Sequence, residues 1–281
     1  SGEVRRLMIG GSAARSFSVE SFLVRPAISI DGTADGAAVS PEIGLRVPVG
    51  SRIALRARAG QAFRMPTLAD MNFSPGLRVR SNPDLEPERV ILDAEMGLEG
   101  SSDAGGYELS GGISGWYRQT EDPIVWLASA AALWTPRNLD RLVSYGVEGS
   151  VEVSTQRTRS AGWGLSAAAT LDHSRLGFGS NQNPVPYRPG TAATLGLQRW
   201  STRLSIRAWV RWTGSRTTTV AGTRSLPGFA TADFAIAWRP PLGVAGFEVE
   251  GRVDNLLDRY YELVELHPEP GRRLSLTVRY R

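Results

Sequence analysis

The segment Arg203-Leu-Ser-Ile-Arg-Ala-Trp-Val-Arg-Trp212 carries the clearest structural signal in the chain. Its even-numbered residues are all apolar or aromatic, and arginine or serine occupies every odd position except that of Trp209. An alternation with a period of two predicts a β-strand with one apolar face and one polar face. The segment is also longer than the five or six residues that are usual for a strand of a globular protein.

The same two-faced pattern recurs along most of the sequence, and it predicts an all-β chain of about 12 to 13 strands. Long strands of this kind are typical of a sheet whose outer face meets lipid and whose inner face meets water. The further segments are 42–49, 51–59, 89–98, 107–118, 145–155, 163–171, 191–198, 232–239, 247–254 and 273–280, with one phase-broken strand in 15–30 and a weak one in 3–10.

The links between these segments alternate between short and long. In an antiparallel up-and-down sheet, alternate links lie on opposite rims, so all the long loops fall on one side, as in outer-membrane barrels. A soluble sandwich has no reason to keep this order. The short links are 48–52, 100–106, 156–161, 200–202 and 239–245, and the long links are 31–41, 64–87, 120–140, 173–189, 214–227 and 257–271.

Aromatic and basic residues fix which face is outward. Tyr107 and Tyr117 share a face and lie ten residues apart, which places them about 25 Å apart across a tilted strand, the height of the apolar band of a barrel. Arginine facing lipid near the midplane costs about 2–4 kcal/mol. The charged face therefore points into the barrel.

Composition excludes several classes of function. The chain of 281 residues has no cysteine, which removes disulfide scaffolds and thiol chemistry, and its 32 basic residues are all arginine, so no lysine-containing phosphate loop exists. The net charge of +4 is dispersed along strands rather than gathered on one face, so nucleic-acid binding is not expected. His173 and His267 lie in separate predicted loops. We expect no catalytic residue, no metal site, no cofactor and no enzyme activity.

Three segments go beyond periodicity. Gly60-Gln-Ala-Phe-Arg-Met-Pro-Thr-Leu68 leads out of a strand, Ser81-Asn-Pro-Asp-Leu-Glu-Pro-Glu88 leads back into the next, and Val253-Asp-Asn-Leu-Leu-Asp-Arg-Tyr-Tyr261 precedes the last loop. With Tyr145-Gly-Val-Glu148 they resemble, in order, motifs in the C-terminal part of the β-barrel of a TonB-dependent outer-membrane receptor. The prolines and Asn or Asp residues also suit turns at the rim of a sheet.

This resemblance implies an antiparallel up-and-down transmembrane β-barrel of which residues 1–281 form the C-terminal portion. The predicted strands are part of the 22 that plugged outer-membrane transporters have. The family's plug domain and TonB-contacting box are not visible in this sequence. By resemblance, the protein lies in the cell outer membrane, contacts its lipid, couples to the TonB complex through the absent plug region, and takes up a scarce nutrient such as an iron–siderophore complex or cobalamin.

The long loops are expected to form the mouth that contacts this small ligand. Their aromatic and basic side chains are the candidate contacts, although each aromatic residue can equally pack one loop on another. The candidates are Trp126, Trp134, Phe178, Tyr187 and Arg188.

Two other functions stay open on the sequence alone. A passive outer-membrane channel, or a surface-binding barrel without TonB coupling, would show the same strands and loops. A soluble all-β binding module would instead bury the apolar face as the core of a sandwich. An incomplete barrel would also expose two unpaired sheet edges, which favour aggregation.

Overall fold

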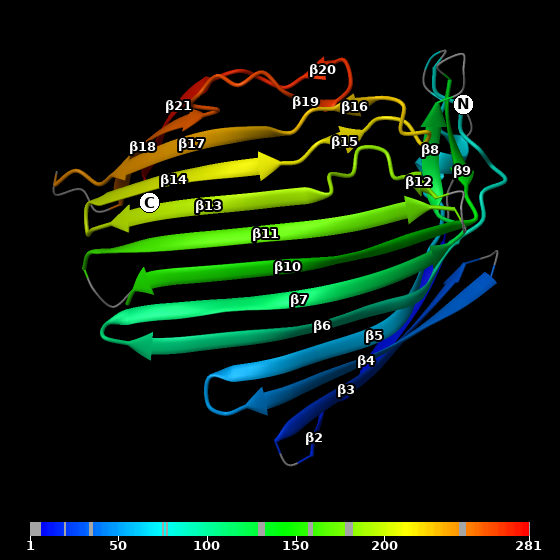
Figure 1. Cartoon of the computed structure of the whole chain (residues 1–281), viewed down its shortest axis with the longest axis horizontal. Helices are drawn as coiled ribbons and strands as arrows, with labels where there is room; N and C mark the ends of the chain where they lie inside the picture. Colours follow the sequence, from blue (N-terminus) through cyan, green and yellow to red (C-terminus); the bar gives the residue numbers. More distant parts are fainter. Residues whose placement is uncertain are drawn as a thin grey trace.

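A computed structural model describes residues 7–19, 21–33, 36–74, 76, 78–128, 133–156, 160–177, 182–241 and 246–280. Across this part of the chain the dominant feature is one large antiparallel sheet. Its main strands lie side by side in sequence order, and the short elements between some of them do not change that order. Figure 1 shows the sheet as a single curved wall, from the blue strands at the bottom to the orange and red strands at the top. The predicted all-β, up-and-down architecture is therefore confirmed.

The path across this wall contains thirteen strands in the described part of the chain, in sequence order. They are Met8–Ala14 (β1), Phe22–Thr33 (β3), Gly36–Val49 (β4), Ile53–Arg64 (β5), Glu88–Ala104 (β6), Tyr107–Glu121 (β7), Arg141–Thr155 (β10), Gly162–Leu176 (β11), Thr191–Trp200 (β13), Leu204–Thr213 (β14), Phe229–Trp238 (β17), Phe247–Asp254 (β18) and Arg273–Tyr280 (β21). The wall does not close on itself, because β1 and β21 end the path.

Short elements accompany the wall, mostly within the predicted long loops. Phe17–Val19 (β2) pairs with β3, and Asn183–Pro184 (β12) pairs with β11. The remaining elements are helix Leu68–Asn72 (α1), hairpin Ile124–Ala128 (β8) with Trp134–Asn138 (β9), Arg216–Thr217 (β15) with Ser225–Leu226 (β16), and Glu262–Val264 (β19) with His267–Pro268 (β20).

Links of opposite kinds lie at opposite rims of the wall. Figure 1 shows tight turns such as β6–β7 and β13–β14 at the left, whereas β8, β9 and β12 lie at the right. One predicted long link, 31–41, is wrong: β3 runs to Thr33 and β4 begins at Gly36. From Pro41 back towards Gly36, β4 has only β3 as a partner, and proline is tolerated where a strand has a free side. The strand predicted in 15–30 is a hairpin that turns at Ser21, where its phase breaks.

The outward face of the wall is apolar and uncovered by any other described element. Val151 at mid-wall is 45% exposed, and Leu276 on β21 is 74% exposed. A sandwich would cover such residues with a second sheet, so the soluble two-sheet alternative is wrong. Tyr107 at the start of β7 and Tyr117 ten residues further along are also exposed on this face, which agrees with the predicted outward direction of these two side chains.

The large buried apolar side chains lie near the loop rim. Within the described residues, Leu85 and Leu226 are buried in the loops, and Leu176 and Phe229 are buried at the loop ends of β11 and β17. The loop rim, rather than the middle of the wall, therefore packs like the interior of a globular protein. No helix of the described ranges is long and apolar enough to cross a membrane.

Candidate functional site

The two rim motifs recognised in the sequence meet each other. Arg64, at the end of β5, and Glu88, at the start of β6, are partners across the ladder. Their side chains form an ion pair, and the same glutamate accepts a hydrogen bond from the backbone N–H of Ile124, where the next loop hairpin begins. The motif residues therefore join two adjacent loops, which is a structural role at the mouth.

The described residues of 65–87 and 122–139 form what we call the first loop unit. Helix α1 begins after Thr67, whose hydroxyl accepts a hydrogen bond from the Asp70 N–H, while the Asp70 carboxylate accepts from the Thr67 N–H. This reciprocal capping satisfies donors that a short helix would otherwise leave free. The second oxygen of Asp70 accepts from the Trp126 indole N–H at 3.0 Å. One buried carboxylate thus connects the two loops.

Trp134 joins the same two loops through its backbone. It forms a parallel bridge with Val79, its backbone N–H donates to the Arg78 carbonyl at 2.8 Å, and its carbonyl accepts from the Arg80 N–H at 2.9 Å. Asn82 adds a bond from its side-chain amide to the Pro136 carbonyl. Trp126 and Trp134 are therefore placed where one loop packs on the other.

Replacing Asp70 with alanine is expected to loosen the first loop unit by about 1–3 kcal/mol, because bonds to a charged acceptor disappear and the Trp126 N–H loses its partner. Hydrogen exchange of residues 65–74 and 124–138 should accelerate. Asp84→Ala is the matched control, since that exposed carboxylate in the same loop makes no ion pair in the described part of the chain. Equal acceleration in both variants would contradict this role of Asp70.

The same carboxylate predicts a pH dependence. Burial alone would raise the pKa of Asp70, but hydrogen bonds from Thr67 and Trp126 and the Arg64 charge lower it below its usual range. A depressed folded-state pKa gives stability that is present above the unfolded value and is lost as the pH falls through the folded value. We therefore expect exchange in this unit to accelerate below about pH 4 in the native protein and not in Asp70→Ala.

Residues 182–190, 214–228 and 255–272 form the second loop unit. The Tyr187 N–H donates to the Thr217 carbonyl at 2.7 Å, and Phe229 stacks on Tyr261 with ring centroids 4.3 Å apart. An ion pair joins Arg224 to Glu265. Burial, followed by the charge of Glu265, raises the pKa of the Tyr187 phenol. Three loops distant in sequence thus converge in one hydrogen-bonded unit.

Backbone conformation shows how the last motif starts its loop. Asn255 has a φ of 50° and its side chain bonds both the N–H and the carbonyl of Arg259, which closes a tight turn. Asp258, at a φ of 52°, accepts from the Arg272 N–H at 2.7 Å on the returning segment. Asparagine and aspartate tolerate this left-handed region better than most residues. The prediction that these two residues begin a loop is confirmed.

The remaining candidate contacts have different surroundings. Arg188 forms an ion pair with Asp172 at 2.7 Å and lies 5.8 Å from the Trp116 ring centroid. Asp172 and Trp116 are on the inward face of β11 and β7, so Arg188 lies at the top of the inner wall. Phe178 lies outside the described residues. The four described candidates are therefore not brought to one point, and Trp126 and Trp134 connect loops.

The inner wall below the loops is polar and largely charge-paired. Glu99 pairs with Arg46 and Arg56 at 3.2 and 2.7 Å, and Arg58 pairs with Glu95 at 2.9 Å. Comparable cross-strand pairs join β14, β17, β18 and β21. Most of these side chains remain partly exposed, so each pair contributes little stability. The pairs instead produce a polar wall in which many of the described charges are balanced across neighbouring strands.

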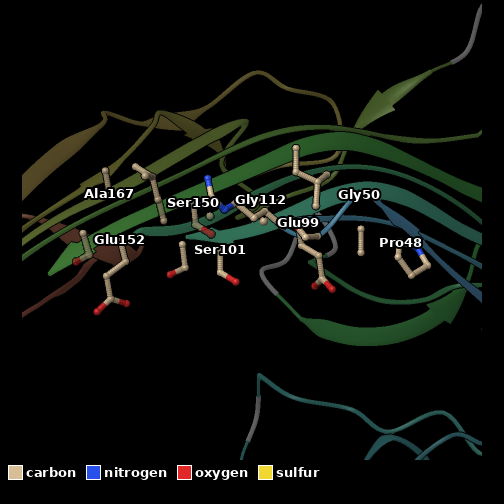
Figure 2. Close-up of a pocket in the computed structure, with 18 of the residues that line it drawn as sticks. Pro48, Gly50, Glu99, Ser101, Gly112, Ser150, Glu152 and Ala167 are labelled. Carbon is tan, nitrogen blue, oxygen red and sulfur yellow. The ribbon is translucent and has the colours of Figure 1, made fainter. Parts of the chain in front are cut away.

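Between these charged strips the wall is lined by small residues. An open hollow of about 780 Å³ lies over β5, β6, β7, β10 and β11 near the short turns. Figure 2 shows Glu99, Ser101 and Glu152 pointing from the strands into its open side. Ser150 and Gly112 contribute to its floor. Such a surface can contact water or a hydrophilic solute, and it offers no grouping of nucleophile, base and orienting residue.

Sequence reasoning missed Asp70 as the centre of the first loop unit and Arg216 in the second. The spacing of Thr67 and Asp70 after Pro66 is a capping-box signal and was sufficient to find the first. Arg216 is buried and contacts Phe229 at the start of β17 and Glu262 in the last loop, and no local pattern marks it.

Comparison with known proteins agrees with this architecture. The family model described as TonB dependent receptor-like, beta-barrel matches residues 14–256. A comparison with curated proteins gave no match. Similar solved structures include a ferric enterobactin receptor from Pseudomonas aeruginosa (18% identity, TM-score 0.70), the copper transporter OprC (18%, 0.74) and the FrpB iron transporter from Neisseria meningitidis (17%, 0.70).

These structures define how much of a receptor the chain represents. Each alignment covers 97% of this chain, but only 44%, 48% and 45% of the three solved chains, respectively. The chain therefore spans less than half the length of the structures it matches. At such low identity the likeness shows the fold, whereas the family model covers most of the sequence. This chain belongs to the TonB-dependent receptor family, as part of its β-barrel.

Proposed function

We propose that residues 1–281 are the C-terminal barrel portion of an outer-membrane receptor that imports a scarce nutrient with energy from the TonB complex. The apolar outward face contacts membrane lipid, and the two loop units capture the ligand outside. A plug region beyond this chain fills the barrel and contacts TonB. The complete barrel has about 22 strands, of which the described part of this chain supplies thirteen.

The observation that carries this proposal is the pairing of a two-sided wall with folded loops at a single rim. A passive pore needs the wall, but it does not need several loops tied together by buried hydrogen bonds such as Trp126 to Asp70. Structured loops over a polar lumen suit ligand capture. The similar structures carry names that refer to ferric enterobactin, iron and copper, and we infer a substrate of this general kind, an iron–siderophore complex or cobalamin.

Candidate ligand contacts remain part of the proposal. Arg188 is the best placed, since its half-exposed guanidinium lies at the top of the inner wall beside Asp172 and Trp116. Tyr187 precedes it in the same loop. Trp126 and Trp134 contribute through the shape of the mouth, and Phe178 stays a candidate contact on the basis of the sequence. No covalent chemistry occurs in this part of the protein, in keeping with a family of receptors and not of enzymes.

A growth experiment tests the proposal. Strains lacking the native protein, lacking TonB, or lacking both are grown with iron removed by 2,2′-bipyridyl, with copper removed by a chelator, or with limiting cobalamin. We expect the strain without the native protein to grow poorly under one of these limitations. Under that limitation, the strain lacking both proteins should grow no worse than the strain lacking TonB alone. An open, TonB-independent conductance of the purified protein in a planar bilayer would favour the passive channel and contradict the proposal.

A further inference from the structure

The second loop unit buries a cation that has no carboxylate partner. Arg216 is only 4% exposed, and no ion pair involves it anywhere in the described part of the chain. One guanidinium nitrogen donates to the Glu262 carbonyl, and the group lies over the Phe229 ring, 5.4 Å from its centroid. The other terminal nitrogen is buried without a hydrogen-bond partner. A buried charge in this state is unfavourable unless an anion meets it.

A second unpartnered donor lies close by in sequence. The Thr218 hydroxyl is also buried without a partner, and its residue is 5% exposed. Strand β15 covers Arg216 and Thr217, and the Thr218 N–H continues the hairpin by donating to the Arg224 carbonyl. The backbone bends at Thr218, just after the strand ends. The two buried, unpartnered donors are therefore two residues apart in one short hairpin.

Arg224, in the same hairpin, shows what an arginine does when it serves only to hold loops. Its side chain is 60% exposed and it pairs directly with Glu265 of the neighbouring loop. Arg216 is far more buried and yet has no such partner. If both arginines served only to hold the loops together, the opposite arrangement would be expected: a carboxylate would pair with the buried arginine, and the exposed arginine would be the one without a partner.

We propose that Arg216 and Thr218 form an anion-binding subsite that receives a carboxylate or phosphate oxygen of the imported ligand. This inference rests on the proposed function and narrows it to ligands that carry such a group. Phe229 covers one face of the guanidinium and Glu262 occupies one nitrogen, so the subsite takes a single terminal oxyanion. The surrounding loop segments must shift to admit the oxyanion. Anion binding is therefore coupled to the rate of amide hydrogen exchange in these loops.

Hydrogen exchange of the full-length protein in detergent tests this subsite. Amide exchange in residues 182–190, 214–227 and 257–271 is followed while sodium phosphate or sodium citrate is added at constant ionic strength set with sodium chloride. At an anion concentration ten times its Kd, opening that requires anion release should slow by about tenfold. The response should be saturable and should disappear in Arg216→Met and weaken in Thr218→Val.

Arg224→Met is the matched control, and it should keep the anion response. Protection by citrate alone, phosphate alone or both supports the subsite and identifies its preferred oxyanion. An equal response in native protein and Arg216→Met, or no response in either, would overturn it. The proposal would also be overturned if, in sodium chloride alone, the loop amides of Arg216→Met exchanged faster than those of the native protein. That result would show that Arg216 serves to hold the loops together.

The two proposals fail separately. Saturable anion protection in a protein that supports no TonB-dependent growth would leave the subsite and contradict transport. TonB-dependent growth without any anion response would leave transport and remove the subsite.

Discussion

Arginine in place of Val151 is expected to lower the free energy of unfolding in lipid by about 2–4 kcal/mol and to reduce the yield of protein in the outer membrane. Val151 lies on the outward face of β10 and is 45% exposed. It pairs with Gly111, which stands between Tyr107 and Tyr117 and so lies near mid-height of the apolar band. The guanidinium would there meet hydrocarbon with no carboxylate on its face.

Ser150→Arg is the matched control one residue away. Ser150 points to the opposite face, into the hollow shown in Figure 2, and stands between Glu148 and Glu152 on the same strand. Those two carboxylates form no ion pair in the described part of the chain. An arginine at 150 should therefore change the free energy of unfolding by less than about 1 kcal/mol.

Urea unfolding of the full-length protein in lipid vesicles measures both variants. A loss at Val151→Arg with little change at Ser150→Arg would assign the outer and inner faces directly. Similar losses in both would contradict the assignment, and a larger loss at Ser150→Arg would reverse it. The comparison is sharp because both changes add the same side chain to the same strand.

These two positions also show why the wall could be predicted from the sequence. A side chain on a strand meets either lipid or water, so neighbouring residues such as Ser150 and Val151 record the environment of each face. The signal repeats over the long strands and is reinforced by the order of short and long links. The prediction of strand bounds fails where a turn-forming residue lies inside a strand. Pro41 was expected to end a loop and instead lies within β4.

The mouth could be predicted only in outline. That loops 64–87 and 120–140 lie at one rim follows from the order of links, but the bond from Trp126 to Asp70 joins residues 56 positions apart. Indole and carboxylate side chains at these positions could equally contact a ligand. Arg216 is a stronger case, because its burial depends on Phe229 and Glu262 together. Contacts between loops obey no period and leave no local pattern to read.

The isolated 281-residue chain is expected to aggregate rather than fold as a monomer. The wall ends at β1 and β21, and every residue of both strands is exposed. Each end presents a row of unpaired backbone donors and acceptors, which in lipid cost several kcal/mol per group. The expected result in detergent is an early, broad elution on size exclusion and no cooperative thermal transition, whereas the full-length protein gives both a single species and a transition.

The cause of this failure can be separated from general instability. The register places the N–H of Thr277 towards Glu250 of β18, so the N–H of Leu276 faces the free edge. Leu276→Pro removes that donor and should reduce self-association through the edge without giving a cooperative melt, because proline disfavours edge pairing but supplies no missing partner. Loss of association with a folded monomer would instead mean that the thirteen strands are sufficient by themselves. A cooperative melt of the unmodified monomer would lead to the same conclusion. The wall would then be a self-contained sheet, and the missing strands would be needed for closure and not for folding.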